Sequence, residues 1–163
     1  MEPPFEELEG VKDIISGYTG GHKKNPTYEE ISSGSTGHYE AVEITYDPEK
    51  ISYEQLLEVL WKNIDPTDEG GSFTDRGQQY STAIFYQNDE QRRLAELSKE
   101  KLEKSGTYKG PVVTKTIRFD VFYKAEDYHQ DYYKKNPLMY KLHREKSGCD
   151  TFLKKVWEGN KNK

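Results

Sequence analysis

Alternation of apolar and polar residues with a period of two predicts the strands of this chain. The alternation is clearest over residues 38–46, where every second position places a side chain on one face: Glu40, Val42, Ile44 and Tyr46. Residues 113–123 alternate in the same way, and residues 11–18 and 82–86 are also predicted to be extended. We therefore expect four strands.

Capping residues and apolar positions at helical spacing predict helices between these strands. Ser52 and Gln55 have the spacing of a capping box and begin a helix that reaches about Ile64, with its leucines on one side. Asn88 caps a charged helix that ends near Lys104. Further helical segments are predicted at residues 1–8, 27–30 and 126–134, the last ending before Asn136-Pro137, and from about residue 150 onward.

This order of elements mixes strands and helices and contains several βα units. It indicates an α+β fold, an α/β sandwich with helices packed on a mixed sheet, of which the ferredoxin-like arrangement is one example. The 163 residues suit one domain, which we place at residues 1–158, with a disordered tail over residues 159–163. Residues 65–79 form a long glycine-rich loop, and a loop of that length is usually functional or mobile.

Composition narrows the class of protein. The 13 Tyr and 2 Trp supply apolar area for a tyrosine-rich core and pocket. The net charge of −5 leaves no basic face for nucleic acid or an anionic membrane, and no apolar stretch approaches the roughly 18 residues of a membrane span. The single cysteine excludes an internal disulfide. We expect a cytoplasmic monomer with no nucleic-acid or membrane partner.

Several common chemical motifs are absent from the sequence. Residues 17–21 are glycine-rich, but no Gly-Lys-Ser/Thr follows them, so they are not a P-loop. His38 and Glu40 have the spacing of a zinc deaminase, which also needs a Pro-Cys-x-x-Cys that this chain lacks. The four histidines share no spacing typical of metal ligands. We therefore expect neither a metal nor a cofactor.

Glu40 is the most informative single residue. The strand pattern places its carboxylate on the same face as Val42 and Ile44, where an unpartnered charge is costly. Burial would raise the pKa of this carboxyl, which suits a general acid near neutral pH. The alternative is that the start of the strand is frayed and that Glu40 is solvated or salt-bridged.

Four other side chains are candidates for a site. Tyr28 and Tyr80 lie beside loops rich in Gly, Asn and Asp, and a tyrosine hydroxyl can donate to a developing oxyanion, although both could be ordinary packed tyrosines. Asp75 lies in a turn-like run and could simply be an Asx-turn aspartate. Cys149 precedes the last helix, where a thiol is either acidified and reactive or without a role.

Several short segments are informative because of the order in which they occur along the chain. They are Gly17–Gly21, Asn25–Tyr28, Ser33–Val42, Tyr46–Pro48, Asp65–Thr67, Asp75–Ile84 and Ala125–Gln130. Each is weak alone, but together they resemble the motifs of the A-type peptide methionine sulfoxide reductases over nearly the whole chain.

The resemblance implies reduction of methionine S-sulfoxide, free or in oxidised proteins, to methionine. In that family a cysteine thiolate attacks the sulfoxide sulfur, a glutamate protonates the oxygen and tyrosines hydrogen-bond it. The cysteine becomes a sulfenic acid, a second thiol converts it to a disulfide, and thioredoxin or another thiol reductant reduces the disulfide. The matching glutamate is Glu40, the tyrosines are Tyr28 and Tyr80, and Asp75 is the aspartate of an Asp-x-Gly-x-Gln-Tyr motif.

One motif of the family has no counterpart in this sequence. Its nucleophilic cysteine lies in Gly-Cys-Phe-Trp, after a strand and one or two residues before the position of Met1. We expect these 163 residues to be a truncated product of a reductase with little or no activity, and a selenocysteine codon read as a stop is one route to it. The alternatives are a non-catalytic protein that binds methionine sulfoxide, and Cys149 as a substitute nucleophile, for which a recycling role is the more plausible.

Overall fold

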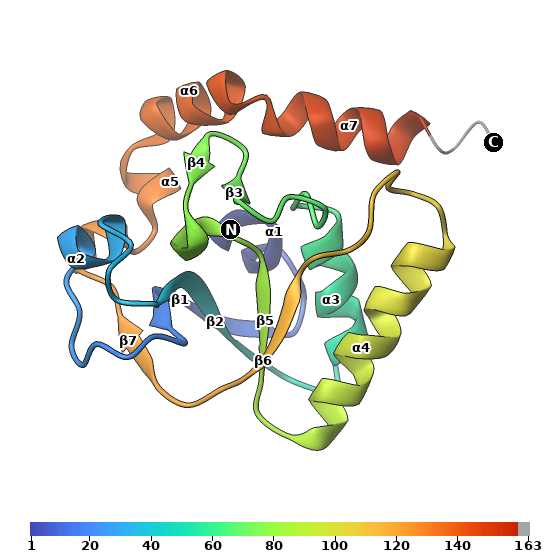
Figure 1. Cartoon of the computed structure of the whole chain (residues 1–163), viewed down its shortest axis with the longest axis horizontal. Coiled ribbons are helices and arrows are strands. Elements are labelled where there is room, and N and C mark those ends of the chain that lie inside the picture. The colour runs from blue at the N-terminus through green and yellow to red at the C-terminus, as the bar shows by residue number, and fades with distance from the viewer. Residues whose placement is uncertain (160–163) are drawn as a thin grey trace.

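Two strands from the first third of the chain and one strand that follows residue 121 form an antiparallel sheet (Figure 1). The computed structural model describes residues 1–159, and the order of strands in this sheet is β2-β1-β7. The strands are β1 Val11–Thr19, β2 Tyr39–Tyr46 and β7 Phe122–Lys124. β1 pairs with β2 along its whole length, from Val11 opposite Tyr46 to Thr19 opposite Tyr39, so the strands expected over residues 11–18 and 38–46 are confirmed.

A separate sheet consists of two parallel strands, β5 Ala83–Tyr86 and β6 Lys115–Arg118. The expectation of one strand over residues 113–123 is therefore wrong, because this segment pairs with two partners. Its first part pairs with β5, and after a bend at residues 119–121 it continues as β7 and pairs with β1. Alternation of apolar and polar residues does not show where an extended segment changes the strand with which it pairs. The α+β class holds, with antiparallel and parallel pairs in different sheets.

Three helices of the first two thirds of the chain begin where the capping residues predict: α2 Tyr28–Ser32, α3 Tyr53–Trp61 and α4 Asp89–Lys104. The first helix, α1 Glu2–Glu6, has prolines in its first turn and no side-chain cap. Thr27 and Ser52 each form a complete capping box, and the Asn88 side chain accepts a hydrogen bond from the Gln91 N–H. These local bonds satisfy backbone donors that a helix leaves free at its first turn.

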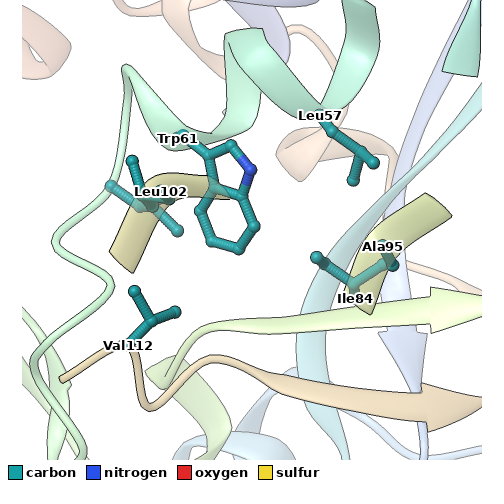
Figure 2. Close-up of a cluster of buried hydrophobic side chains, with 7 residues drawn as sticks. Leu57, Trp61, Ile84, Ala95, Leu102 and Val112 are labelled. Atoms are coloured by element: carbon teal, nitrogen blue, oxygen red, sulfur yellow. The ribbon is translucent and has the colours of Figure 1, made fainter. Parts of the chain in front are cut away.

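The largest apolar core lies where α3 and α4 pack against β5, and Figure 2 shows Trp61 among its neighbours. Its buried members are Leu57, Trp61, Ile64, Ala95, Leu102, Ile84 and Val112. Trp61 is 3% exposed, and its indole N–H donates to Ser98 Oγ at 2.6 Å, which joins the two helices. The apolar face predicted for the helix that begins at Ser52 is thus the face that α3 buries. On α4 the buried residues are Ala95 and Leu102, whereas Leu97 is 38% exposed, so an inward Leu97 is wrong.

The loop expected over residues 65–79 contains short elements. They are the hairpin strands β3 Gly71–Ser72 and β4 Asp75–Arg76 and the 3₁₀ turn η1 Gln78–Tyr80. Arg76 donates to both carboxylate oxygens of Asp68, at 2.6 and 2.9 Å, and this bidentate pair ties the hairpin to the start of the loop. The segment is therefore an ordered platform beside the sheet.

The helix expected over residues 126–134 is wrong as a single element. The chain forms a 3₁₀ turn η2 Asp127–His129 and a short helix α5 Tyr132–Lys135. Between them the Gln130 side chain accepts from the Ser16 N–H and donates to Ser16 O and Ala125 O. The next residue, Asp131, takes a left-handed φ of 53°. A distant strand edge thus interrupts a locally helical sequence.

Two long helices complete the fold, α6 Pro137–Ser147 and α7 Cys149–Gly159. The sequence analysis did not predict α6, although Pro137 suits the first helical turn and Gly148 ends the helix with a φ of 71°. α7 begins at Cys149, close to the expected start. It ends at Gly159, the first residue of the expected tail, and residues 160–163 lie outside the described part of the chain. Figure 1 shows α6 and α7 lying across the β3–β4 hairpin.

Candidate active site

A cavity of about 640 Å³ lies between the antiparallel sheet, the β3–β4 hairpin and the C-terminal helices. Four of the five candidates line it, one from each of four elements: Glu40 from β2, Asp75 from β4, Tyr80 from η1 and Cys149 from α7. Tyr28, at the start of α2, is not one of its lining residues. The fold thus gathers side chains that lie up to 109 positions apart in the sequence (149 − 40).

Glu40 lines the cavity from β2, an edge strand whose pairing with β1 continues to Tyr39. It lies opposite Tyr18 in the β1–β2 register, so the expectation of a frayed strand start is wrong. The solvated Glu40 of that alternative agrees with the structure, in which the residue is exposed. Partial desolvation, and secondarily the negative charge of Asp75, raise the pKa of Glu40 to about 7. The positive charge of the Met1 amino group acts in the opposite direction. A carboxyl with this pKa is about half protonated at neutral pH.

The two candidate tyrosines differ in their position around Glu40. Burial raises the pKa of the Tyr80 hydroxyl, and the negative charge of Glu40 adds to this effect. Tyr80 is therefore neutral at neutral pH, and its hydroxyl can donate a hydrogen bond within the cavity that Glu40 also lines. Tyr28 also influences Tyr80 electrostatically, while its ring packs against His129 with centroids 4.4 Å apart. Tyr28 thus lies close enough to Tyr80 to act on it electrostatically, although it is not one of the residues that line the cavity.

Asp75 contacts the C-terminal helices. Its carboxylate lies 3.4 Å from Nε2 of His143 on α6, and among residues 1–159 it accepts no hydrogen bond from the turn backbone. The reading of Asp75 as an Asx-turn aspartate is therefore wrong. Its charge acts on Glu40 and Tyr80, which makes it an electrostatic neighbour of both.

Cys149 is 6% exposed and is the first residue of α7. Desolvation raises the pKa of its thiol, and the nearby Arg144 guanidinium offsets this only in part. The shift is opposite to the acidification expected for a thiol at a helix N-terminus, because desolvation outweighs the positive charges of Arg144 and the Met1 amino group. The thiol is accordingly protonated at neutral pH, although it faces the same cavity as Glu40.

Glu126 supports the site in a way that no pattern in the sequence indicated. Its two carboxylate oxygens accept from the Tyr18 hydroxyl at 2.8 Å and from the Tyr28 N–H at 2.9 Å. It therefore fixes the start of α2 to the central strand. Residue 126 belongs to the Ala125–Gln130 segment that carried part of the resemblance, which was the one signal that pointed to it.

His38 fixes the backbone that leads into Glu40. The ring is 1% exposed, and its Nδ1 accepts from the Gly21 N–H at 3.0 Å. Nε2 must then carry the hydrogen that is shared with Lys23 O at 2.7 Å. A Cβ on Gly21 would lie 2.3 Å from the His38 backbone nitrogen, so only glycine allows this close approach. The histidine is structural.

A sequence model of the family described as "Peptide methionine sulfoxide reductase" matches residues 1–161. The chain belongs to the A-type peptide methionine sulfoxide reductase family. The peptide methionine sulfoxide reductase MsrA of Bacillus licheniformis is 56% identical over 157 residues, covering 96% of this chain and 87% of that protein. The corresponding protein of Bacillus subtilis is 53% identical, with 96% and 89% covered.

Solved structures of the same family share the fold. Methionine sulfoxide reductase A of Corynebacterium diphtheriae superposes with a TM-score of 0.72 at 34% identity, covering 82% of this chain and 68% of that one. Reduced Mxr1 from Saccharomyces cerevisiae gives 0.72 at 29% identity, with 80% and 74% covered. The reaction of the family is reduction of methionine sulfoxide to methionine with electrons from a thiol, and the protein is thus assigned to the oxidoreductases. Within residues 1–159, no helix has the length and apolar character needed to cross a membrane.

The raised pKa of Glu40 predicts an abnormal titration. Carbon-13 NMR of the side-chain carboxyls should show one glutamate with a midpoint near 7, and Asp75→Asn should lower that midpoint because a negative neighbour is removed. Acetylation of the Met1 amino group should raise it, because a positive neighbour is removed.

The same shift has a consequence for stability. The native pKa exceeds the ordinary value, so the stability contributed by protonated Glu40 is complete below about pH 4.3 and is lost as the pH rises through about 7. A Glu40 midpoint below 5 in the NMR titration would contradict the assignment of this carboxyl as a desolvated acid.

Proposed function

We propose that Glu40 is the proton donor in the reduction of methionine S-sulfoxide, and that Tyr28 and Tyr80 hydrogen-bond the sulfoxide oxygen. The observation that carries this proposal is the Glu40 pKa of about 7 in a cavity shared with Tyr80 and Asp75. An acid whose pKa lies near the working pH both gives up its proton and regains it readily. Asp75 acts on this acid through its charge and is a positioning residue.

The reaction follows from this arrangement. A thiolate (or selenolate) sulfur bonds to the sulfoxide sulfur while the oxygen takes the proton of Glu40. The oxygen then transfers to the attacking atom, so methionine leaves with the electron pair and the thiol becomes a sulfenic acid. A second thiol condenses with the sulfenic acid to form a disulfide and releases water. A dithiol reductant, which we take to be thioredoxin, reduces that disulfide by exchange.

We further propose Cys149 as a recycling thiol, because it faces the cavity that holds Glu40. Its burial and protonation argue against a role as the first nucleophile, since a thiolate is the reactive form.

The remaining proposals are that residues 1–158 form one domain and that the protein is a cytoplasmic monomer. Its substrates would be oxidised proteins and free methionine sulfoxide.

Residues 1–163 alone should show little reductase activity, because their single thiol is buried and protonated. Placing Gly-Cys-Phe-Trp one or two residues ahead of Met1 should raise activity from background to a clearly measurable rate. The Met1 amino group supports this design, since its charge acts on both Glu40 and Cys149, so a preceding residue would enter the same cavity. The measurement is methionine formed from L-methionine S-sulfoxide with dithiothreitol or thioredoxin as the reductant.

Two variants distinguish between an added nucleophilic cysteine, Cys149 as a recycling thiol or nucleophile, and a non-catalytic protein. The extended chain with serine in place of the added cysteine should return to background, and Cys149→Ser in the active extended chain should slow thioredoxin-dependent turnover if Cys149 recycles the enzyme. Turnover by the unextended chain that disappears in Cys149→Ser would instead make Cys149 the nucleophile. Binding of the sulfoxide with no turnover by either chain would favour the non-catalytic protein.

A further inference from the structure

His143 brings an ionisable base from the C-terminal helices to the candidate active site. It lies on α6, and its Nε2 is 3.4 Å from a carboxylate oxygen of Asp75 on β4. Both residues line the cavity that Glu40 also lines. The two side chains are 56% and 45% exposed, so the imidazole can exchange its proton with solvent. A change in the charge of His143 therefore acts at contact distance on Asp75.

The C-terminal helices hold this histidine against the β3–β4 hairpin, across which they lie in Figure 1. The next residue, Arg144, donates through Nε to Asp150 on α7 at 2.9 Å and so joins the two helices. On α7 the Phe152 ring packs edge to face against Phe73 in the turn of the hairpin, with centroids 5.7 Å apart. The hairpin that carries Asp75 thus touches both helices, and the contact with the imidazole is part of that packing.

The other cations close in sequence to this pair are bound to other carboxylates. Arg76, the neighbour of Asp75, donates to both carboxylate oxygens of Asp68. Arg144 forms its ion pair with Asp150. Within the part of the chain that the structure describes, the imidazole on α6 is the one basic group in an ion pair with Asp75. Its protonation is therefore what decides whether the Asp75 charge is offset.

The charge of Asp75 in turn acts on Glu40. It is the second cause, after desolvation, of the raised Glu40 pKa of about 7, and it also acts on Tyr80. Ionisable groups from further elements line the same cavity: Glu2 on α1, Glu43 on β2, His129 on η2, Cys149 on α7 and the Met1 amino group. Imidazoles ordinarily change charge near pH 6.5, which is close to the range in which Glu40 titrates. A positive ring offsets part of the Asp75 charge, whereas a neutral ring leaves that charge to act on Glu40 in full.

We propose that His143 is a positioning residue for the proton donor, and that it sets, through Asp75, how firmly Glu40 holds the proton that it gives to the substrate. This inference rests on the proposed function of Glu40. As the pH rises and the ring becomes neutral, the Asp75 charge favours the protonated form of Glu40, so the acid keeps its proton to a higher pH. His143 acts through another residue and is not itself the donor.

Two substitutions of His143 should move the titration midpoint of Glu40 in opposite directions. His143→Lys supplies a permanent positive charge, so the midpoint in carbon-13 NMR of the 163-residue chain should fall by roughly 0.3–0.7 pH unit. His143→Gln removes the charge, so the midpoint should rise. The rise should be smaller than the fall, because an ordinary imidazole carries only part of its positive charge near pH 7. A merely structural role would shift both variants in the same direction.

A second background and a control test the route through Asp75. In Asp75→Asn the difference between the Lys and Gln variants should largely disappear, because the charge that the ring offsets is gone. His22→Gln, which changes an exposed histidine that does not line the cavity, should leave the midpoint unchanged. Equal midpoints in the two His143 variants, or a difference that persists in Asp75→Asn, would overturn the inference while a parent midpoint near 7 upholds the proposed function. A parent midpoint below 5 would instead count against the proposed function.

Discussion

Glu40→Gln, made in the chain that carries Gly-Cys-Phe-Trp ahead of Met1, should lower kcat/KM for methionine S-sulfoxide by about 10²–10⁴-fold. Glutamine keeps the size of the side chain and can still donate a weak hydrogen bond, but it has no acidic proton to give to the departing oxygen. The loss should therefore fall mainly on kcat, because an interaction that strengthens in the transition state is removed.

The pH dependence of kcat/KM in the unsubstituted extended chain and in Glu40→Gln provides a second test of the proton donor. The unsubstituted enzyme needs Glu40 protonated, so its rate should fall as the pH rises through the pKa of that carboxyl, which is about 7 in the structure. Joining a residue to Met1 removes the ammonium charge that lowers this pKa, so the midpoint of the extended chain should lie somewhat higher. Glu40→Gln should lose this limb of the profile.

A matched control tests whether the loss of activity in Glu40→Gln is specific to this position. Glu58→Gln changes an exposed glutamate on α3 that does not line the cavity, and its rate should equal that of the parent. A loss in Glu40→Gln below tenfold, or an unchanged pH limb, would show that another group supplies the proton.

Trp61→Ala should cost about 3–5 kcal/mol of unfolding free energy, the range typical of a large aromatic residue removed from a core. The indole is 3% exposed within the cluster shared by α3, α4 and β5, and its loss also leaves Ser98 Oγ without the N–H that it accepts at 2.6 Å. Domains of this size are stable by roughly 5–15 kcal/mol, so the variant should unfold at much lower urea.

Trp157→Ala provides the comparison with the same chemical change. Trp157 lies on α7 and is only partly buried where it packs against the same cluster and, with ring centroids 6.1 Å apart, against Tyr108. The decrease in unfolding free energy in Trp157→Ala should be clearly smaller than the decrease in Trp61→Ala. Similar midpoints for the two variants in urea denaturation followed by circular dichroism would mean that the α3–α4 core does not dominate stability.

The amino-acid sequence by itself determined the local elements of the first two thirds of the chain. Ser52 and Asn88 begin their helices because a side-chain oxygen accepts from a backbone N–H three residues away, which is information held within one turn. The alternation over residues 38–46 placed Glu40 on the same face as Val42 and Ile44, and all three residues line the cavity. The order of the motifs indicated the family and, with it, the site residues.

Only the tertiary structure decided which strands pair, where a predicted element is interrupted and which side chains come together in the site. Residues 113–123 alternate as one strand, but they pair first with β5 and then with β1, and residues 126–134 are interrupted because Gln130 bonds to Ser16. The same holds for the site. The pKa of Glu40 depends on desolvation and on Asp75, and Cys149 is protonated because the fold buries it. Strand partners, burial and charge proximity join residues far apart in sequence, so no local pattern of side chains encodes them.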